Sequence, residues 1–147
     1  MAIKALTLDT GGTILDWHGG ISRAFAAAGA RRGLQADWHE LANEYRRRSL
    51  KGMVGQVHPG FNFDNVYRRV LDEVIAQFGL DALTAEDRDH IWRTWHALDA
   101  WPDFPAAAAR LRKRYVVASF TLLTTSLVVD VSKKNSIDWD EIGRAHV

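Results

Sequence analysis

The sequence predicts an α/β fold with a parallel sheet at its core and a helical insertion after the first strand. A short apolar run over residues 3–9 stops at Gly11-Gly12, which is typical of a buried parallel strand. From about residue 18 to residue 98 the apolar residues recur with the helical period of 3.6. A second apolar run, residues 115–121, ends in the hydroxyl of Thr121. Two strand patterns that flank a helical block indicate one core and one inserted unit.

The composition excludes several classes of function. Of the 147 residues, 47% are apolar and 25% are charged, and the formal net charge is +1. Such a balance gives no reason to expect a nucleic-acid or membrane partner. The absence of Cys excludes disulfides, thiolate metal sites and a Cys nucleophile. With no secretory leader and no apolar stretch of the roughly 18 residues that span a bilayer, we expect a cytoplasmic protein. Whether it forms a homodimer stays open.

Four helices are expected inside the helical block, each with an apolar stripe on one side. Side chains that cap helix N-termini and glycines that close helix C-termini mark the expected boundaries. In chain order these markers are Gly29 or Gly33, Asp37 with Glu40 three residues on, a loop at Gly52, Gly55, Pro59 and Gly60, then Gly79 and Thr84.

Beyond the block, a short helix is expected over 106–114 and another over 124–135. We therefore assign 1–16 to the first core strand and its turn, 17–98 to a helical cap and 99–140 to the continued core. The last residues, 141–147, look like translated read-through of a sequencing adapter, so we expect a non-native tail. Because an open parallel sheet usually has about five strands, we also expect part of the core to be missing.

The turn after the first strand carries the strongest chemical signal. Asp9 ends the strand and is followed by Gly11-Gly12 and Thr13. Open α/β sheets place their chemistry at the carboxyl ends of the strands. A carboxylate there can attack an electrophile and form an ester that water later cleaves. Asp also commonly begins an ordinary turn, but the Gly-Gly-Thr context favours a nucleophile.

Thr13 and Thr121 are the expected hydroxyl partners of Asp9. Thr13 can orient the Asp9 carboxylate, although it can also simply cap the next segment. Thr121 ends the second strand as Asp9 ends the first, so adjacent parallel strands would make them neighbours. A hydroxyl in that position can bind an anionic substrate group, and a Thr at a strand end is also ordinary.

Together these features resemble the haloacid dehalogenase superfamily, and within it the type II (L-2-haloacid) dehalogenases. Residues 8–17 (LDTGGTILDW) are similar to the family's opening motif. Residues 95–103 (WHALDAWPD) resemble its return from cap to core, and residues 137–140 (IDWD) the segment after its second core helix. The resemblance covers nearly all of residues 3–140. It implies the N-terminal part of a Rossmann-like core with an inserted helical-bundle cap.

The resemblance also implies a mechanism. Asp9 displaces halide from the 2-carbon of a short haloacid, and water then hydrolyses the enzyme ester without a cofactor or a metal. An Arg of the cap binds the substrate carboxylate, and the match falls on Arg46, whose planar fork suits a carboxylate. Because three consecutive Arg side chains cannot all point inward, residues 46–48 can also be read as a solvated helix face. The remaining substrate-binding candidates are Gly11, Leu50 and Phe63.

The residue at position 11 distinguishes the predicted dehalogenase from the first alternative, a phosphohydrolase of the same superfamily. Phosphatases of the superfamily usually carry a second Asp two residues after the nucleophile, where it protonates the leaving alcohol. Here that residue is Gly11, and a halide leaving group needs no proton. A Mg²⁺-dependent phosphohydrolase using Asp9 and the Gly11 carbonyl is the alternative.

The sequence also departs from the family pattern. Thr121 is followed by Leu122 and Leu123 where the family's dehalogenases usually have Asn and Gly. The family's later Lys and acidic motifs have no counterpart here, so we expect the chain as given to be inactive. A non-catalytic fragment is therefore the second alternative. We assign Trp101, with the other tryptophans of residues 38–101, to core and cap–core contacts.

Overall fold

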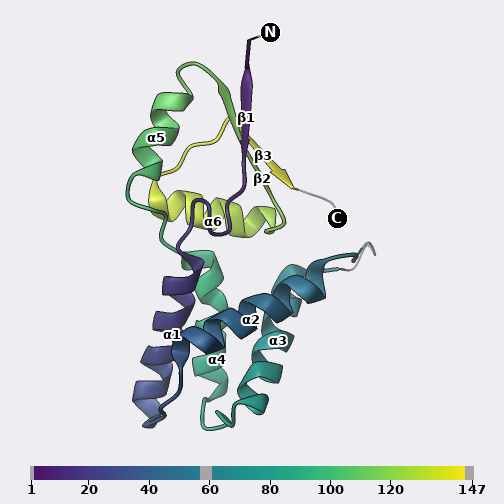
Figure 1. Ribbon diagram of the computed structural model, residues 1–147, viewed down its shortest axis with the longest axis vertical. Coiled ribbons are helices and arrows are strands. Elements are labelled where there is room, and N and C mark those ends of the chain that lie inside the picture. Colours follow the sequence, from purple (N-terminus) through teal and green to yellow (C-terminus); the bar gives the residue numbers. More distant parts are fainter. Residues whose placement is uncertain (1, 57–60, 145–147) are drawn as a thin grey trace. The chain divides into compact units, whose positions relative to one another are not determined.

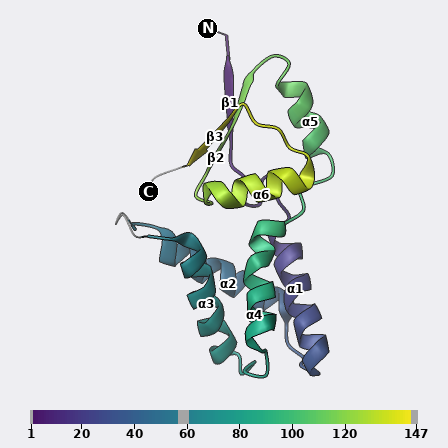
Figure 2. The ribbon, with the colours of Figure 1, turned by 180° about the vertical axis from the view of Figure 1, so that it is seen from behind.

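The structure, a computed structural model, describes residues 2–56 and 61–144. It confirms the α/β class, with a three-stranded parallel sheet and inserted helices (Figure 1). Within the described residues the chain divides into two units, 2–17 with 96–144 and 18–95. We call them the sheet unit and the helical unit. Figure 2 shows the same elements from behind.

The sheet unit contains three parallel strands in the order β1-β2-β3. They are β1 (Ala5–Leu8), β2 (Val116–Thr121) and β3 (Glu141–Arg144). Helix α5 (Phe104–Leu111) precedes β2, and α6 (Thr125–Asn135) connects β2 to β3. The strands β1 and β2 lie where the sequence predicts them. The third strand was not predicted, because its residues belong to the segment assigned to the tail; residues 145–147 lie outside the described residues.

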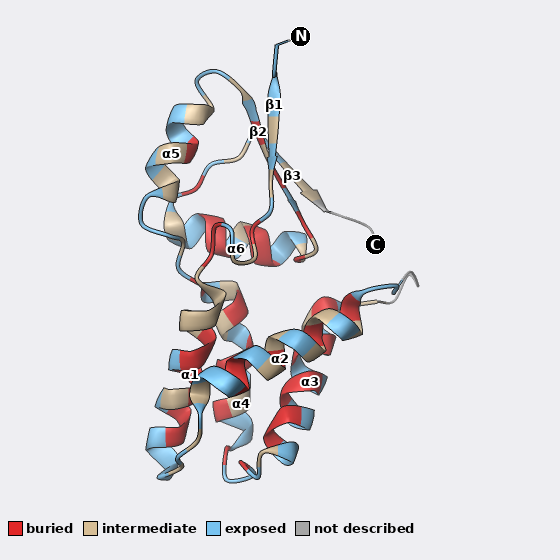
Figure 3. Cartoon of the chain, in the orientation of Figure 1, coloured by how far each residue is buried: buried red, intermediate tan, exposed pale blue. Residues whose placement is uncertain are grey.

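The two faces of the sheet differ in burial (Figure 3). Along β2 the side chains of Val117, Ser119 and Thr121 are buried, whereas Val116 and Phe120 are 48% and 53% exposed. Helix α5 contacts β2 and α6 contacts β3. Because successive side chains of a strand point to opposite faces, the buried set defines the covered face and the exposed set an open face.

The helical unit is built from α1 (Trp17–Arg32), α2 (Trp38–Met53), α3 (Phe63–Gln77) and α4 (Ala85–Arg93), followed by the 3₁₀ turn η1 (Thr94–Ala97). The predicted caps are confirmed. Asp37 accepts from two backbone N–H groups of the first turn of α2, and Thr84 forms a capping box with Asp87. Gly79, beyond α3, has a φ of +66°.

Two boundaries of the helical unit differ from the prediction. Helix α2 continues through Gly52 to Met53, so Gly52 is helical and not part of a loop. The fourth helix ends at Arg93, and the apolar stripe continues through η1, where Trp95 is buried. Pro59 and Gly60 lie outside the described residues.

Aromatic side chains form the centre of the helical unit. The rings of Tyr67 and Trp95 stack with centroids 4.5 Å apart, and Tyr45 meets both edge-on. The Tyr45 hydroxyl donates to the backbone carbonyl of Tyr67 at 3.0 Å. Such edge and stacked pairs add to the stability that burial supplies. No helix among the described residues combines the length and the apolar character that a membrane crossing requires.

In the sheet unit, the segment around Leu15, which follows the turn after β1, pairs antiparallel with the segment around Ala100, which follows the helical unit. Leu15 pairs with Ala100, and the Trp101 backbone N–H donates to the carbonyl of Ile14 at 2.8 Å. Asn135, the last residue of α6, holds the second segment: its side chain accepts from the Ala100 N–H and donates to the Leu98 carbonyl. These bonds fix the segment that returns from the helical unit against the one that leaves the sheet.

Candidate active site

The turn after β1 presents an exposed carboxylate. Asp9 follows the last residue of the strand, and the Thr13 hydroxyl donates to Asp9 Oδ2 at 3.0 Å. The turn closes because the N–H groups of Ile14 and Leu15 both donate to the Thr10 carbonyl at 3.1 Å. A carboxylate that is held by one hydroxyl and open to solvent can act as a nucleophile or as a hydrogen-bond acceptor.

Gly12 shapes this turn, and any side chain there would be strained. Its φ is +103°, in a region that side-chain-bearing residues rarely adopt. A Cβ on Gly12 would lie 3.2 Å from the indole nitrogen of Trp17. The indole N–H of Trp101 donates to the Gly12 carbonyl at 3.1 Å. Gly11, a predicted substrate-binding residue, lies in the same turn and forms a parallel bridge to Leu15.

Thr121 lies at the end of β2 and is hydrogen-bonded to the turn after β1. Its partner there is Thr10, which was not among the predicted site residues. The Thr10 hydroxyl donates to Thr121 Oγ1 at 2.8 Å, and both side chains are buried. The Leu123 N–H also donates to Thr121 Oγ1, at 3.3 Å. The pairing of Leu8 with Ser119, extended by two residues, sets Thr10 level with Thr121. This strand register is the signal that would have identified Thr10 as the neighbour of Thr121.

Arg46 differs from its two neighbours in the helical unit. Arg47 and Arg48 both bond to the Glu44 carboxylate, at 2.7 and 2.5 Å. The hydrogen bond from Arg47, with that from Arg48, outweighs the opposing effect of burial and lowers the pKa of Glu44 to about 2. The Arg46 guanidinium instead lies over the Trp95 ring, 5.4 Å from its centroid. The three consecutive Arg side chains therefore have two different roles.

Arg46 also acts on the aromatic centre electrostatically. Burial raises the pKa of the Tyr67 hydroxyl well above its usual range, and the nearby Arg46 charge opposes that rise. A guanidinium over an aromatic face keeps its charge while losing part of its hydration.

The other two candidates from the helical unit are apolar. Leu50 lies one turn after Arg46 on α2 and is half-buried. Phe63 begins α3, is 4% exposed and contacts Phe61 with ring centroids 4.9 Å apart. The structure thus groups Asp9, Gly11 and Thr13 with Thr121 in the sheet unit, whereas Arg46, Leu50 and Phe63 belong to the helical unit.

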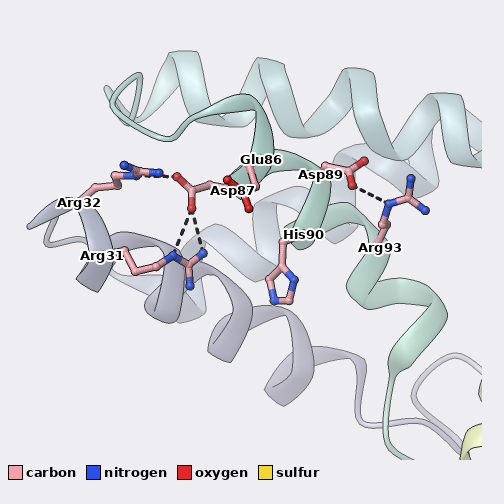
Figure 4. Close-up of a pocket in the computed structure, with 7 residues that line it drawn as sticks. All are labelled: Arg31, Arg32, Glu86, Asp87, Asp89, His90 and Arg93. Carbon is pink, nitrogen blue, oxygen red and sulfur yellow. Dashed lines mark hydrogen bonds and ion pairs between the residues drawn. The ribbon is translucent and has the colours of Figure 1, made fainter.

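A pocket of about 520 Å³ in the helical unit has a different character (Figure 4). Arg31 and Arg32, at the end of α1, donate to the two oxygens of Asp87 at 2.9 and 2.7 Å, and Asp87 is only 2% exposed. Burial alone would raise the pKa of Asp87, but these bonds and those of Thr84 hold it well below its usual range. We interpret this cluster as a structural link between α1 and α4. The other lining residues are Glu86, Asp89, His90 and Arg93.

Over residues 2–56 and 61–144, no group of three or more His, Cys, Asp or Glu side chains is arranged to hold a metal ion.

Comparison with known proteins identifies the fold. No protein-family profile matches the sequence, and no curated protein matches it. Among solved structures, the defluorinating L-2-haloacid dehalogenase Rha0230 is similar with a TM-score of 0.83 and 30% identity, over 95% of this chain and 59% of that one. The L-2-haloacid dehalogenase PA0810 is similar with a TM-score of 0.81 and 29% identity, over 98% of this chain and 63% of that one.

A third structure shows the same fold at lower identity. The L-2-haloacid dehalogenase from Xanthobacter autotrophicus has a TM-score of 0.79 and 18% identity, over 97% of this chain and 57% of that one. The chain thus spans about three fifths of the length of the dehalogenases that it matches. These similarities confirm the resemblance drawn from the motifs. The fold of this chain is therefore similar to that of L-2-haloacid dehalogenases, members of the haloacid dehalogenase superfamily.

Proposed function

We propose that this chain carries part of the catalytic machinery of a hydrolytic 2-haloacid dehalogenase with Asp9 as its nucleophile. An Asp9 oxygen attacks the 2-carbon, the carbon–halogen bond breaks, and the halide leaves with the bonding electrons. Water then attacks the carbonyl carbon of the resulting aspartyl ester. The 2-hydroxy acid leaves, a proton is released and the Asp9 carboxylate is restored.

One observation carries the proposal: the hydrogen bond from Thr13 to Asp9 at the carboxyl end of a parallel strand. The bond engages one carboxylate oxygen, Oδ2, and restrains the rotation of the group. The other oxygen, Oδ1, is then the one proposed to attack a bound substrate. The glycine turn next to Asp9 leaves backbone unobstructed by side chains, so that an anionic substrate can come close.

Arg46 is the proposed partner of the substrate carboxylate. Its guanidinium lies over the ring of the buried Trp95, where it loses part of its hydration. A bidentate bond from such a guanidinium to a carboxylate is among the stronger hydrogen-bonded pairs in proteins.

Chloride release from 2-chloropropionate tests the proposal. The chain is incubated with the haloacid, and chloride is measured together with the mass of the peptide that contains Asp9. If Asp9 is the nucleophile, any chloride release is accompanied by a propionate ester on that peptide, and both are absent from Asp9→Asn. Arg46→Gln should raise the concentration of haloacid needed for half-maximal release by about tenfold or more. Arg47→Gln is its matched control and should change that concentration less than twofold.

Other outcomes point to the alternatives. Equal chloride release from Asp9→Asn contradicts the proposed nucleophile. Phosphate release from p-nitrophenyl phosphate that requires Mg²⁺, without chloride release from the haloacid, indicates the phosphohydrolase. If neither product forms with a folded chain, the non-catalytic interpretation of this chain holds.

A further inference from the structure

The carboxyl edge of the sheet contains a buried hydroxyl pair that the proposed chemistry does not use. Thr10 and Thr121 are 2% and 3% exposed, and their hydroxyl oxygens lie 2.8 Å apart. Burying a hydroxyl without a hydrogen-bond partner lowers the stability of the fold, so buried hydroxyls normally have a defined donor or acceptor beside them. Here the Thr10 hydroxyl is the donor and Thr121 Oγ1 the acceptor.

Thr121 Oγ1 accepts a second hydrogen bond. The Leu123 N–H also donates to Thr121 Oγ1, at 3.3 Å. A hydroxyl oxygen has two acceptor positions and one proton. With both positions filled by Thr10 and Leu123, Thr121 can take part in a further hydrogen bond only by donating its own proton.

The fold holds Thr10 firmly in this arrangement. Its carbonyl accepts from the N–H groups of both Ile14 and Leu15 at 3.1 Å, which fixes the backbone of the turn. The β-branched side chain of Thr has few χ1 rotamers. The register that pairs Leu8 with Ser119 brings Thr10 level with Thr121 on the covered face of the sheet. The Thr10 hydroxyl therefore has little freedom to turn toward another partner.

We propose that Thr10 is a positioning residue, which acts through Thr121 by fixing the Thr121 hydroxyl as a hydrogen-bond donor at the carboxyl edge of the sheet. The inference rests on the proposed function, in which that edge receives an anionic substrate next to Asp9. A donor that is oriented in advance stabilises negative charge without reorganising when the charge arrives. The ligand class is a small organic anion, and Thr10 itself does not touch it.

Three variants test the proposal on the full chain. Thr10→Val removes the hydroxyl and keeps the side-chain shape, whereas Thr10→Ser keeps the hydroxyl. Thr7→Val is the matched control, because Thr7 lies on β1, just before the turn that carries Thr10, and is exposed on the open face. Thermal unfolding checks that all three variants fold as the unmodified chain does.

The first measurement is independent of any ligand. The three-bond coupling between the hydroxyl proton and Hβ of Thr121, measured by NMR, reports the orientation of that proton. We expect one rotamer in the unmodified chain, in Thr10→Ser and in Thr7→Val, and a rotamer-averaged coupling in Thr10→Val. An unchanged coupling in Thr10→Val, or averaging in the unmodified chain, would overturn the proposal.

The second measurement uses 2-chloropropionate as the probe and follows the Thr121 methyl resonance during titration. We expect Thr10→Val to weaken binding by about fivefold and Thr10→Ser by less than twofold. Equal affinity in Thr10→Val and the unmodified chain contradicts a positioning role. If no variant binds the haloacid while the coupling responds as predicted, the proposed substrate class fails and the orientation of Thr121 by Thr10 stands.

Discussion

The indole nitrogen of Trp101 lies 3.1 Å from the carbonyl oxygen of Gly12, 89 residues earlier in the chain. The backbone N–H of Trp101 donates to the carbonyl of Ile14 at 2.8 Å. One residue of the returning segment therefore holds the turn that carries Asp9 at two points. The sequence predicts core and cap–core contacts for Trp101, but its side chain is 42% exposed and its indole nitrogen makes the contact with Gly12.

The first prediction concerns this bond. Trp101→Phe keeps an aromatic ring and removes the N–H that binds Gly12. Because the bond is exposed, the free energy of unfolding should fall by about 1 kcal/mol or less. The amide resonance of Thr13 should shift, since the Gly12 carbonyl belongs to the same peptide group.

Trp139→Phe is the matched control for that variant. It removes an indole bond to Ser132 Oγ, 2.9 Å long, within the same unit. Its loss of stability should be similar, without a shift of the Thr13 amide. A Thr13 amide unaffected by Trp101→Phe would show that the indole bond does not hold the turn.

The second prediction concerns the backbone of the turn. Gly12→Ala places a Cβ at a φ of +103° and 3.2 Å from the Trp17 indole nitrogen. We expect urea denaturation to show a loss of about 2–3 kcal/mol. Gly33→Ala has a φ of +65° and no atom within 4 Å of the added Cβ, so it should cost only about 1 kcal/mol. Equal losses would contradict a strained turn at Gly12.

The third prediction concerns acid stability of the helical unit. The folded-state pKa of Asp87 lies below the unfolded value of about 4, so Asp87 stabilises the folded state above that pH. The contribution should disappear as the pH falls below about 4 and the carboxylate takes up a proton. Asp87→Asn should lower the free energy of unfolding at pH 7 by ~2 kcal/mol, discounted because Arg31 and Arg32 are partly exposed.

Asp89→Asn provides the comparison. Asp89 also binds an Arg, but its side chain is half exposed, so the change should have a small effect at pH 7. Denaturant unfolding between pH 2 and pH 7 measures both variants. A pH dependence of Asp87→Asn as steep as that of the unmodified chain would contradict the role given to Asp87.

The fourth prediction tests the two faces of the sheet with the same change at adjacent residues. Val117 is fully buried on β2, and Val116 is 48% exposed. Val117→Ala should cost about 2–3 kcal/mol of unfolding free energy, because it leaves a cavity as well as losing buried surface. Val116→Ala should cost about 0.5 kcal/mol or less. Similar costs would show that the open face is covered in solution.

The fold class could be predicted because its signals are local. The apolar runs that become β1 and β2 are bounded by turn residues, and the helix caps Asp37 and Thr84 are short-range patterns. Strand β3 could not be predicted, because Glu141–Arg144 has no alternating apolar pattern. It forms beside the free edge of β2, where the Asp140 N–H donates to the Val117 carbonyl and the Asp140 carboxylate accepts from the Val117 N–H.

In the candidate site, too, contacts between residues close in the sequence could be predicted, whereas contacts between distant residues could not. The bond between Asp9 and Thr13 joins residues four apart, so the spacing alone suggested it. The bond between Thr10 and Thr121 joins residues 111 apart and depends on the register of two strands. Arg46 could be preferred over Arg47 and Arg48 only through the family resemblance. Their different contacts become visible once Glu44 and Trp95 are placed.

The most direct test of the central claim is a single turnover in water enriched in ¹⁸O, with the chain in excess over 2-chloropropionate. If Asp9 is the nucleophile, water attacks the aspartyl ester at its carbonyl carbon, and mass spectrometry will find ¹⁸O in the peptide that contains Asp9. If Asp9 only activates water for direct attack on the 2-carbon, ¹⁸O will appear in the hydroxy acid and not in the peptide. That result would contradict the account.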